Sequence, residues 1–407
     1  MKVLFRKLVL DSLKSHSRGT LRLALSDGGR KFFGGLSQEV VAEIVVKDEN
    51  FFRRCVLFGP IGFAESYIAG EWETADLTAV ISWFILNSDE STVLKNRGGG
   101  RGAPLDLLNA LNRFIHLRRP NSRRTSRKNI GDHYDLSNDF FKLWLDPSMT
   151  YSSAYFDPPT LTLEEAQAKK YDVLCRKLRL KPADAVLEIG SGWGGFSLHA
   201  AKNYGCRITT VTISQQQFDE ASRRISNAGL ADRIDLRMCD YRDIEGSFDK
   251  IVSIEMLEAV GDRYVDGYFA KCDQLLKPGG LLALQAILCP DHQYPILRDG
   301  VDFIQKHIFP GSLLMCMSRI TEALRKAGNL SLLDYEDMAS YYARTLLLWR
   351  IAFDGHLEEV KAQGFDDAFV RKWRYYLCYC EAAFATRHIS VAHIVFSRPD
   401  NFGLLPV

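Results

Sequence analysis

The segment from Leu187 to Phe196 constrains the fold of this chain more than any other part of the sequence. Gly190, Gly192 and Gly195 form a Gly-x-Gly-x-x-Gly pattern that follows an apolar run and precedes a stretch with helical spacing. Glycines let a backbone turn tightly and approach a ligand closely, and the amides at a helix N-terminus attract negative charge. The segment therefore predicts a strand, a loop and a helix that together bind a nucleotide-like cofactor.

The strand that follows this loop separates two candidate cofactors. A dinucleotide site has an acidic residue roughly 20 positions after its glycines, where it binds the ribose hydroxyls. Here the strand ends at Val211 and Thr212, and the first acid after it is Asp219, inside the next helix. Glu188 precedes the first glycine by two residues and can attract the cationic aminoacyl end of S-adenosylmethionine, directly or by ordering the loop. We therefore expect S-adenosylmethionine rather than a dinucleotide.

Short apolar strands alternate with helices from Asn129 onward. This alternation predicts a parallel sheet with helices on both faces. After Cys289 the pattern changes to helices, with one strand-like run and a C-terminal edge strand over 388–397. The other predicted strands are 185–189, 207–212, 234–238, 250–254, 280–287 and 331–335, and the later helices are 297–328, 338–363 and 366–386.

The residues before Asn129 predict a small α+β domain over 1–92 and a basic linker over 93–128. Between Lys95 and Lys128 there are ten Lys or Arg residues against one acid. This segment could meet an anionic surface or be a solvated connector, and 105–117 within it could form a short amphipathic helix. The remaining residues, 129–407, form the predicted catalytic domain.

Composition argues against several other classes of protein. The chain of 407 residues has a net charge of +2, too small to attract nucleic acid through a global field. It has no run of about 18 uncharged apolar residues, so we expect no membrane span. Arg6, Lys7 and Asp11 interrupt the apolar N-terminus, which argues against a signal peptide. The nine cysteines include no CxxC pair and indicate free thiols, without a metal site, in a cytoplasmic protein.

Further motifs accompany the glycine loop in a fixed order. They are Gly62–Tyr67 with Gly70–Glu73, His133–Asn138, Met149–Phe156, Leu187–Phe196, Val211–Gln217, Glu255–Gly261, Ile308–Gly311 and Val395–Pro399. With these motifs the chain resembles, over nearly its whole length, the cyclopropane fatty acid synthases, which are class I methyltransferases acting on unsaturated acyl chains of phospholipids. The resemblance implies an α/β fold, with a class I (Rossmann-like) methyltransferase sheet, a helical lipid-binding insertion and a small α+β N-terminal domain.

The resemblance also assigns residues to the cofactor. Tyr151 and Ser152 would contact the methionine part of S-adenosylmethionine, and Gly190 and Gly192 would form the floor of its site. Glu188 would lie beside them. The ribose and adenine would be held by Thr212, Ile213, Gln217, Asp240, Tyr241, Arg242 and Ile254.

A second implied ligand is a bicarbonate ion, held by Glu258, Gln285 and Tyr342 with backbone amides near Ser153. Ser153 stands where many members of the family have Cys, and Gln285 stands where many have His. A glutamine can still donate to an oxyanion, and a backbone amide does not depend on its own side chain, so we expect anion binding to survive. His133 could act as a direct base, but we expect it in a lid over the cofactor.

The implied reaction transfers a methyl group from S-adenosylmethionine to the double bond of an acyl chain. A base then removes a proton, and loss of this proton from the added methyl closes a cyclopropane ring. Loss from a neighbouring carbon would instead leave a methyl-branched or exomethylene chain. A methyltransferase for a soluble small molecule and a non-catalytic lipid-binding protein remain as alternatives.

The implied substrate is an unsaturated phospholipid at a membrane surface. We therefore expect peripheral contact with the inner face of the membrane, and a homodimer formed through the N-terminal domain. The segment 297–328 is predicted to form an apolar mouth for the lipid, with core packing as the alternative. Its apolar residues are Leu297, Phe303, Ile308, Phe309, Leu313, Leu314 and Met315.

Overall fold

The computed structural model describes residues 2–35, 40–88, 136–399, 401 and 404. They belong to two compact units. The first unit comprises Met1–Arg118, Asp299–Ile308 and Leu346–His388, and the second comprises Arg119–Arg298, Phe309–Thr345 and Ile389–Val407. The predicted linker 93–128, the predicted helix 105–117 and His133 lie outside the described residues.

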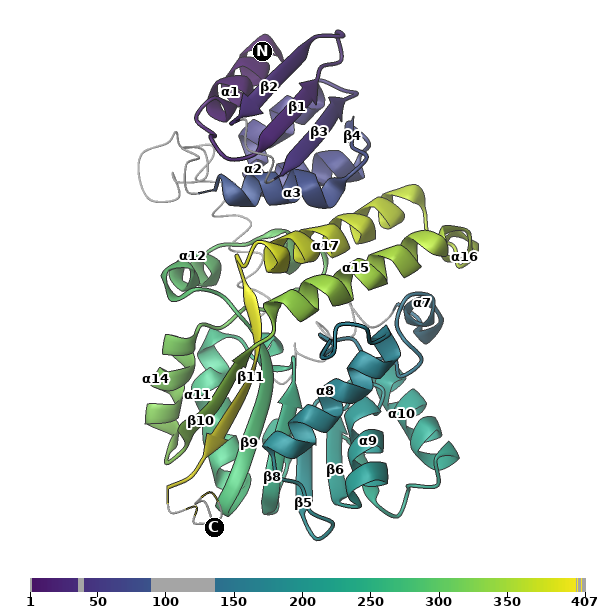
Figure 1. Ribbon diagram of the computed structural model, residues 1–407, viewed down its shortest axis with the longest axis vertical. Helices are drawn as coiled ribbons and strands as arrows, with labels where there is room; N and C mark the ends of the chain where they lie inside the picture. The colour runs from purple at the N-terminus through teal and green to yellow at the C-terminus, as the bar shows by residue number, and fades with distance from the viewer. Residues whose placement is uncertain (1, 36–39, 89–135, 400, 402–403, 405–407) are drawn as a thin grey trace. The chain divides into compact units, whose positions relative to one another are not determined.

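The first unit contains a four-stranded sheet in the order β2-β1-β3-β4, together with helices (Figure 1). β1 pairs antiparallel with β2 and parallel with β3. A turn at Asp27–Gly29 joins β1 to β2, with Gly28 at a φ of +86°. Its α+β character agrees with the prediction. The elements are α1 (Lys2–Leu13), β1 (Thr20–Ala24), β2 (Arg30–Gly34), β3 (Val41–Val46), α2 (Asn50–Ile68), β4 (Trp72–Glu73) and α3 (Leu77–Leu86).

Segments from later in the chain complete the first unit. They are α13 (Phe303–His307), the second half of α15 (Ala339–Gly355), α16 (Leu357–Ala362) and α17 (Asp367–Ala385). Arg371 of α17 donates to the carbonyl of Trp72 at 3.0 Å and to Glu73 at 2.9 Å. Glu65 of α2 accepts from Lys306 at 2.7 Å. The compact units are thus discontinuous in sequence, and the contiguous domains 1–92 and 129–407 stay a prediction.

The second unit is built on a seven-stranded sheet in the order β10-β11-β9-β8-β5-β6-β7. The strands from β9 to β7 are parallel, as the alternation predicts. Each predicted strand is present within a few residues. The strands are β5 (Ala185–Ile189), β6 (Arg207–Thr212), β7 (Ile234–Met238), β8 (Phe248–Ile254), β9 (Leu276–Leu288), β10 (Ser331–Asp337) and β11 (Ser390–Ser397).

The prediction of an edge strand at the C-terminal end of the chain is wrong. β11 lies between β9 and β10 and pairs antiparallel with both, so the sheet is mixed and β10 is the edge. The physical reason is visible in the burial of β11, whose residues 391–397 are all buried, on both faces of the sheet. A continuous apolar run of this kind is typical of an interior strand.

Helices cover both faces of this sheet (Figure 1). One apolar core lies under α8, α9 and α10, and a second lies under α11 and α14. Local signals set where the helices begin: Thr162 and Glu165 form a capping box at α8, and Ser214 caps α10. The helices are α7 (Asn138–Lys142), α8 (Leu163–Lys177), α9 (Gly195–Tyr204), α10 (Gln215–Asn227), α11 (Asp262–Leu275), α12 (Tyr294–Asp299) and α14 (Met317–Ala327).

The predicted apolar mouth over 297–328 requires correction. Phe303, Ile308, Leu313 and Met315 are buried, at 8% exposure or less, so these side chains belong to the core. The later part of the segment forms α14, whose Arg319 donates to carboxylates of α11. Core packing, the alternative, is therefore correct for these four residues, while Leu297, Phe309 and Leu314 are half-buried.

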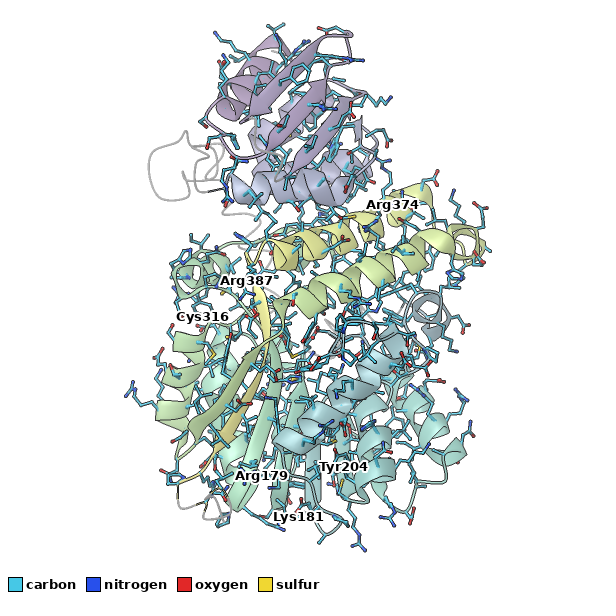
Figure 2. The ribbon with its side chains drawn as sticks, viewed as in Figure 1. Arg179, Lys181, Tyr204, Cys316, Arg374 and Arg387 are labelled. Carbon is cyan, nitrogen blue, oxygen red and sulfur yellow. The ribbon has the colours of Figure 1, made fainter. Side chains whose placement is uncertain are left out.

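The amino and carboxyl ends of the parallel strands have different residues beside them. Figure 2 labels Arg179, Lys181 and Tyr204 near the edge where β5 and β6 begin. The glycine loop follows the opposite, carboxyl end of β5. Ligands of open α/β sheets bind at this carboxyl edge. Within the described ranges, no helix is long and apolar enough to span a bilayer.

Candidate active site

The glycine loop leaves the carboxyl end of β5 in a tight turn. Gly190 and Gly192 have positive φ values of +95° and +49°, which side chains with a Cβ rarely adopt. The amides of Gly190 and Ser191 both donate to the carbonyl of Val211, at 3.1 and 2.9 Å, and so tie the loop to β6. A Cβ placed on Gly192 would meet nothing within 4 Å. The loop therefore has open space beside Gly192.

The third glycine of the motif has a packing role. A Cβ on Gly195 would lie 2.4 Å from the hydroxyl oxygen of Tyr171, so only glycine lets α9 begin this close to α8. That hydroxyl is 2.6 Å from the hydroxyl of Thr150. The Tyr171 side chain thus lies between Gly195 of the glycine motif and the segment that contains Thr150, Tyr151 and Ser152.

Glu188 lies buried in β5 beneath the loop. Its carboxylate accepts hydrogen bonds from Ser197 of α9 and from Thr210 of β6, the latter at 2.6 Å. Burial raises the pKa of Glu188 to about 7, while these hydrogen bonds and the charge of Lys170 lower it. Of the two roles expected for Glu188, these contacts support ordering of the loop.

The residues expected to hold the ribose and adenine follow the ends of neighbouring strands. At the end of β6, the hydroxyl of Thr212 donates to the amide oxygen of Gln217 at 2.9 Å, and Ile213 between them is half-buried. After β7, Arg242 pairs with Asp240 through two hydrogen bonds of 2.8 and 2.6 Å. The short 3-10 helix Tyr241–Asp243 contains Tyr241, and Ile254 is the last residue of β8. Because β8, β5, β6 and β7 are consecutive in the sheet, these residues lie side by side at the carboxyl ends of the strands.

The segment with Tyr151 and Ser152 is held by α8. Lys170 donates to the hydroxyl of Ser152 at 2.6 Å, and Gln167 donates to the Ser152 carbonyl at 2.9 Å. Lys170 is fully buried, and burial lowers its pKa, against the attraction of nearby carboxylates. The ring of Tyr151 lies against Phe141 and Trp144, with centroid separations of 5.5 and 5.3 Å.

Three of the predicted catalytic positions converge on one side chain that the sequence reasoning did not select. The backbone amide of Ser153 donates to Oε1 of Glu255 at 2.8 Å, and Nε2 of Gln285 donates to the same oxygen at 2.7 Å. The hydroxyl of Tyr342 donates to Oε2 of Glu255 at 2.7 Å. Glu255 directly follows β8, and its carboxylate is the centre of the predicted catalytic group.

Gln285 is oriented by a further buried residue. Nε2 of His393, on β11, lies 2.9 Å from Oε1 of Gln285. Burial holds the pKa of His393 well below its usual value, so the ring is neutral and its Nε2–H donates to the amide oxygen. The Gln285 amide nitrogen is then directed at Glu255 and at the carbonyl of Ser153, 3.2 Å away.

Glu258 lies next to this group but has different surroundings. One carboxylate oxygen accepts from the amide of Ile287, and the other, also buried, has no hydrogen-bond partner among the described residues. Burial, and then the charge of Glu255, raises the pKa of Glu258 to about 8. Near neutral pH Glu258 is therefore protonated.

The donors that the resemblance assigns to bicarbonate thus donate to the protein's own carboxylate. The Ser153 amide, Gln285 and Tyr342 all end on Glu255, so these residues do not fit a second anion in the same place. Glu255 stands in the motif Glu255–Gly261, directly after a strand, and that position was the available signal for it. Carboxyl ends of parallel strands are where functional side chains of such sheets gather.

Comparisons with known proteins agree with this geometry. The family model described as mycolic acid cyclopropane synthetase matches residues 121–394. The tuberculostearic acid methyltransferase of Mycobacterium tuberculosis is 36% identical over 389 residues, covering 91% of this chain and 86% of the relative. The cyclopropane-fatty-acyl-phospholipid synthase of Escherichia coli is 34% identical over 367 residues, covering 89% and 90%.

Solved structures show the same relationship. A crystal structure of a mycolic acid cyclopropane synthase in complex with SAH and CTAB is 29% identical, with a TM-score of 0.63, and covers 67% of this chain and 98% of its own. SAH is S-adenosylhomocysteine, the demethylated form of S-adenosylmethionine. The sheet, the glycine loop with its open space and the matching family lead to one conclusion. The chain belongs to the mycolic acid cyclopropane synthetase family and is an S-adenosylmethionine-dependent methyltransferase.

Proposed function

We propose that the protein transfers a methyl carbon from S-adenosylmethionine to the double bond of an unsaturated phospholipid acyl chain and closes a cyclopropane ring. The observation that carries the proposal is a half-buried carboxylate beside the segment expected to contact the cofactor. Glu255 accepts a hydrogen bond of 2.8 Å from the backbone amide of Ser153, the residue after Ser152. A group able to accept a proton therefore stands next to a segment expected to bind the methyl donor.

The chain's own residues have three tasks in this reaction. The sulfonium of S-adenosylmethionine supplies a methyl group electrophilic enough for an alkene to attack. Tyr151, Ser152 and the glycine loop position that methyl group, because reacting atoms must be held about 3–3.5 Å apart. The walls of the acyl pocket must exclude water, because water would trap the carbocation that forms in the acyl chain. A base must then remove one proton.

The direct test uses the purified protein with vesicles of an unsaturated phospholipid and methyl-labelled S-adenosylmethionine. We expect upfield proton NMR signals of a cyclopropane methylene that carries the label. A methyltransferase for soluble substrates would instead label candidate amines and leave the vesicles unlabelled. A lipid-binding protein without catalysis would label neither, and calorimetry would then show no binding of S-adenosylmethionine.

A second product is favoured by two specific observations. A relative of this chain is named a tuberculostearic acid methyltransferase, and another, 33% identical over 302 residues, is named a sphingolipid C9-methyltransferase. The donors that the resemblance assigns to a bicarbonate base also end on Glu255 in this chain. The same first step would then end in a methyl-branched or exomethylene chain. Alkene =CH2 signals without upfield ring signals would establish the exomethylene chain and exclude the ring.

Access to a phospholipid requires contact with a membrane surface. The basic residues between Lys95 and Lys128 support peripheral binding to the anionic inner face of a membrane, from the cytoplasmic side. The resemblance supports a homodimer formed through the N-terminal domain 1–92, followed by the linker and the catalytic domain 129–407. Light scattering of the purified chain would measure its oligomeric state.

A further inference from the structure

The carboxylate of Glu255 occupies a site built to hold an anion. Its three donors come from three separate parts of the second unit: the segment before α8, strand β9 and helix α15. Gln285 is fixed behind the carboxylate by His393, so its amide cannot turn away without losing a buried hydrogen bond. Donors of this kind stabilise a negative charge where they converge.

The backbone at Glu255 has a conformation that glycine adopts more readily than residues with a Cβ. Its φ is +48°, in the left-handed region, and its amide donates to the carbonyl of Gln285 at 2.7 Å. A glycine would adopt this conformation freely, whereas a residue with a Cβ is strained there. Strain of this kind gathers at functional sites. The side chain of Glu255, and not its backbone conformation, therefore accounts for a glutamate at this position.

Glu255 and Glu258 differ in the groups that surround their carboxylates. Burial raises the pKa of Glu255, but the Ser153 amide, Tyr342, Gln285 and the charge of Lys170 all lower it. The Glu258 carboxylate accepts one hydrogen bond, from a backbone amide, and the charge of Glu255 repels it. Burial and this repulsion raise the pKa of Glu258 to about 8. The three donors that end on the Glu255 carboxylate favour its ionised form, whereas the Glu258 carboxylate accepts one hydrogen bond, from a backbone amide.

We propose that Glu255 is the base of the reaction and takes the place that the resemblance assigns to a bicarbonate ion. This inference rests on the proposed function. An alkene carbon gains a bond to the transferred methyl carbon as the methyl–sulfur bond breaks, with its electron pair kept by sulfur. The neighbouring carbon becomes cationic. Glu255 then accepts a proton from the chain, and the electrons of that C–H bond close the ring or form a new double bond.

Two substitutions test the role of Glu255. Glu255→Gln keeps the shape and an accepting oxygen but cannot take the proton, and a lost base typically lowers kcat by about 100-fold or more. Glu255→Gly relieves the positive φ and empties the anion site, so added bicarbonate or formate should fill it. The matched control is Glu245→Gly, at an exposed loop position without a described hydrogen bond.

The measurements separate a base from a structural residue. In buffer freed of carbon dioxide, the wild-type enzyme should keep its full rate, and Glu255→Gly should lose activity and regain it with bicarbonate or formate. Both variants should bind S-adenosylmethionine with unchanged affinity by calorimetry. A wild-type enzyme that needs added bicarbonate, or a Glu255→Gln variant that keeps more than about a tenth of the wild-type kcat, overturns the inference.

A binding measurement keeps this inference distinct from the proposed function. Calorimetry with formate should show an anion site in Glu255→Gly that the wild type and Glu245→Gly lack. If the wild type labels no lipid, the proposed function fails, while a new formate site in Glu255→Gly still supports Glu255 as the occupant of the anion site. If no variant gains a formate site, Glu255 does not stand in for an anion.

Discussion

Glu255, Glu258 and Lys170 are interacting titratable residues of the second unit; Glu258 and Lys170 are buried, and Glu255 is half-buried. Lys170 is placed by its hydrogen bond to Ser152, and it attracts the carboxylate of Glu255. Glu258 is repelled by the same carboxylate. The protonation states of these residues depend on one another, so each can be tested by removing a neighbour and following a pH dependence.

Lys170→Met should shift the acid limb of the pH–rate profile. Lys170 lowers the pKa of Glu255, so its removal raises that pKa further. A base works only when ionised, and activity falls as pH drops through its pKa. We therefore expect the kcat of Lys170→Met to decline at a higher pH than that of the wild type. An unchanged acid limb would show that Glu255 does not control the rate.

Glu258→Gln should change how stability depends on pH. In the unfolded chain Glu258 ionises near the ordinary glutamate pKa of 4.5, whereas the folded residue stays protonated up to about pH 8. Folding then retains a proton, so the stabilising contribution of Glu258 is complete below pH 4.5 and is lost as pH rises through about 8. Relative to the wild type, Glu258→Gln should gain stability from pH 5 to pH 8. Urea unfolding at both pH values measures this, with Glu245→Gln as the exposed control.

At the scale of elements, a glycine can determine how closely two helices approach each other. Gly195 begins α9 against the Tyr171 hydroxyl, and Gly267 lies exposed within α11 with open space around it. Glycine is therefore required at position 195 and can be replaced at position 267. This difference is a matter of packing, because both positions are helical in the sequence pattern.

Gly195→Ala and Gly267→Ala should have opposite effects on stability. The added methyl at Gly195 would lie 2.4 Å from the Tyr171 hydroxyl and would displace that ring from Thr150. At Gly267 the methyl meets nothing within 4 Å. An exposed helical glycine replaced by alanine typically adds about 0.5–1 kcal/mol to the free energy of unfolding. Thermal unfolding of both variants tests this, and destabilisation by Gly267→Ala would contradict it.

At the scale of the whole molecule, a near-neutral chain has a strongly uneven distribution of charge. Its net charge is +2, yet the residues from Lys95 to Lys128 have ten basic side chains and one acid. Basic side chains near an anionic membrane contribute up to about 1 kcal/mol each to binding, and salt screens them. The basic linker is therefore the expected electrostatic contact with a phospholipid surface.

Binding to anionic vesicles should weaken as salt rises. Sedimentation with vesicles containing phosphatidylglycerol, at about 50 and 500 mM salt, should show a loss of bound protein as screening increases. Replacement of Arg118, Arg119, Arg123, Arg124 and Arg127 by Gln should lower the binding at low salt and flatten its salt dependence. Neutral phosphatidylcholine vesicles are the control. Binding that ignores salt would remove the electrostatic contribution from the proposal.

The sequence by itself determined the features that depend on neighbouring residues. The glycine loop, the alternation of strands and helices, the preference for S-adenosylmethionine and the family all follow from local patterns, and the structure and the comparisons confirm them. These patterns are readable because backbone periodicity and turn chemistry act over a few residues. The same locality explains the error at β11, whose burial on both faces depends on its sheet partners.

Only the tertiary structure decided which carboxylate stands at the centre of the site. The donors to Glu255 come from positions 102, 30 and 87 residues away in sequence, and the backbone amide of Glu255 donates to the carbonyl of Gln285 on β9. Sequence reasoning selected Ser153, Gln285 and Tyr342 but assigned them to an external ion. The chain folds so that these donors converge on Glu255, and long-range packing of this kind leaves no periodic pattern in the sequence.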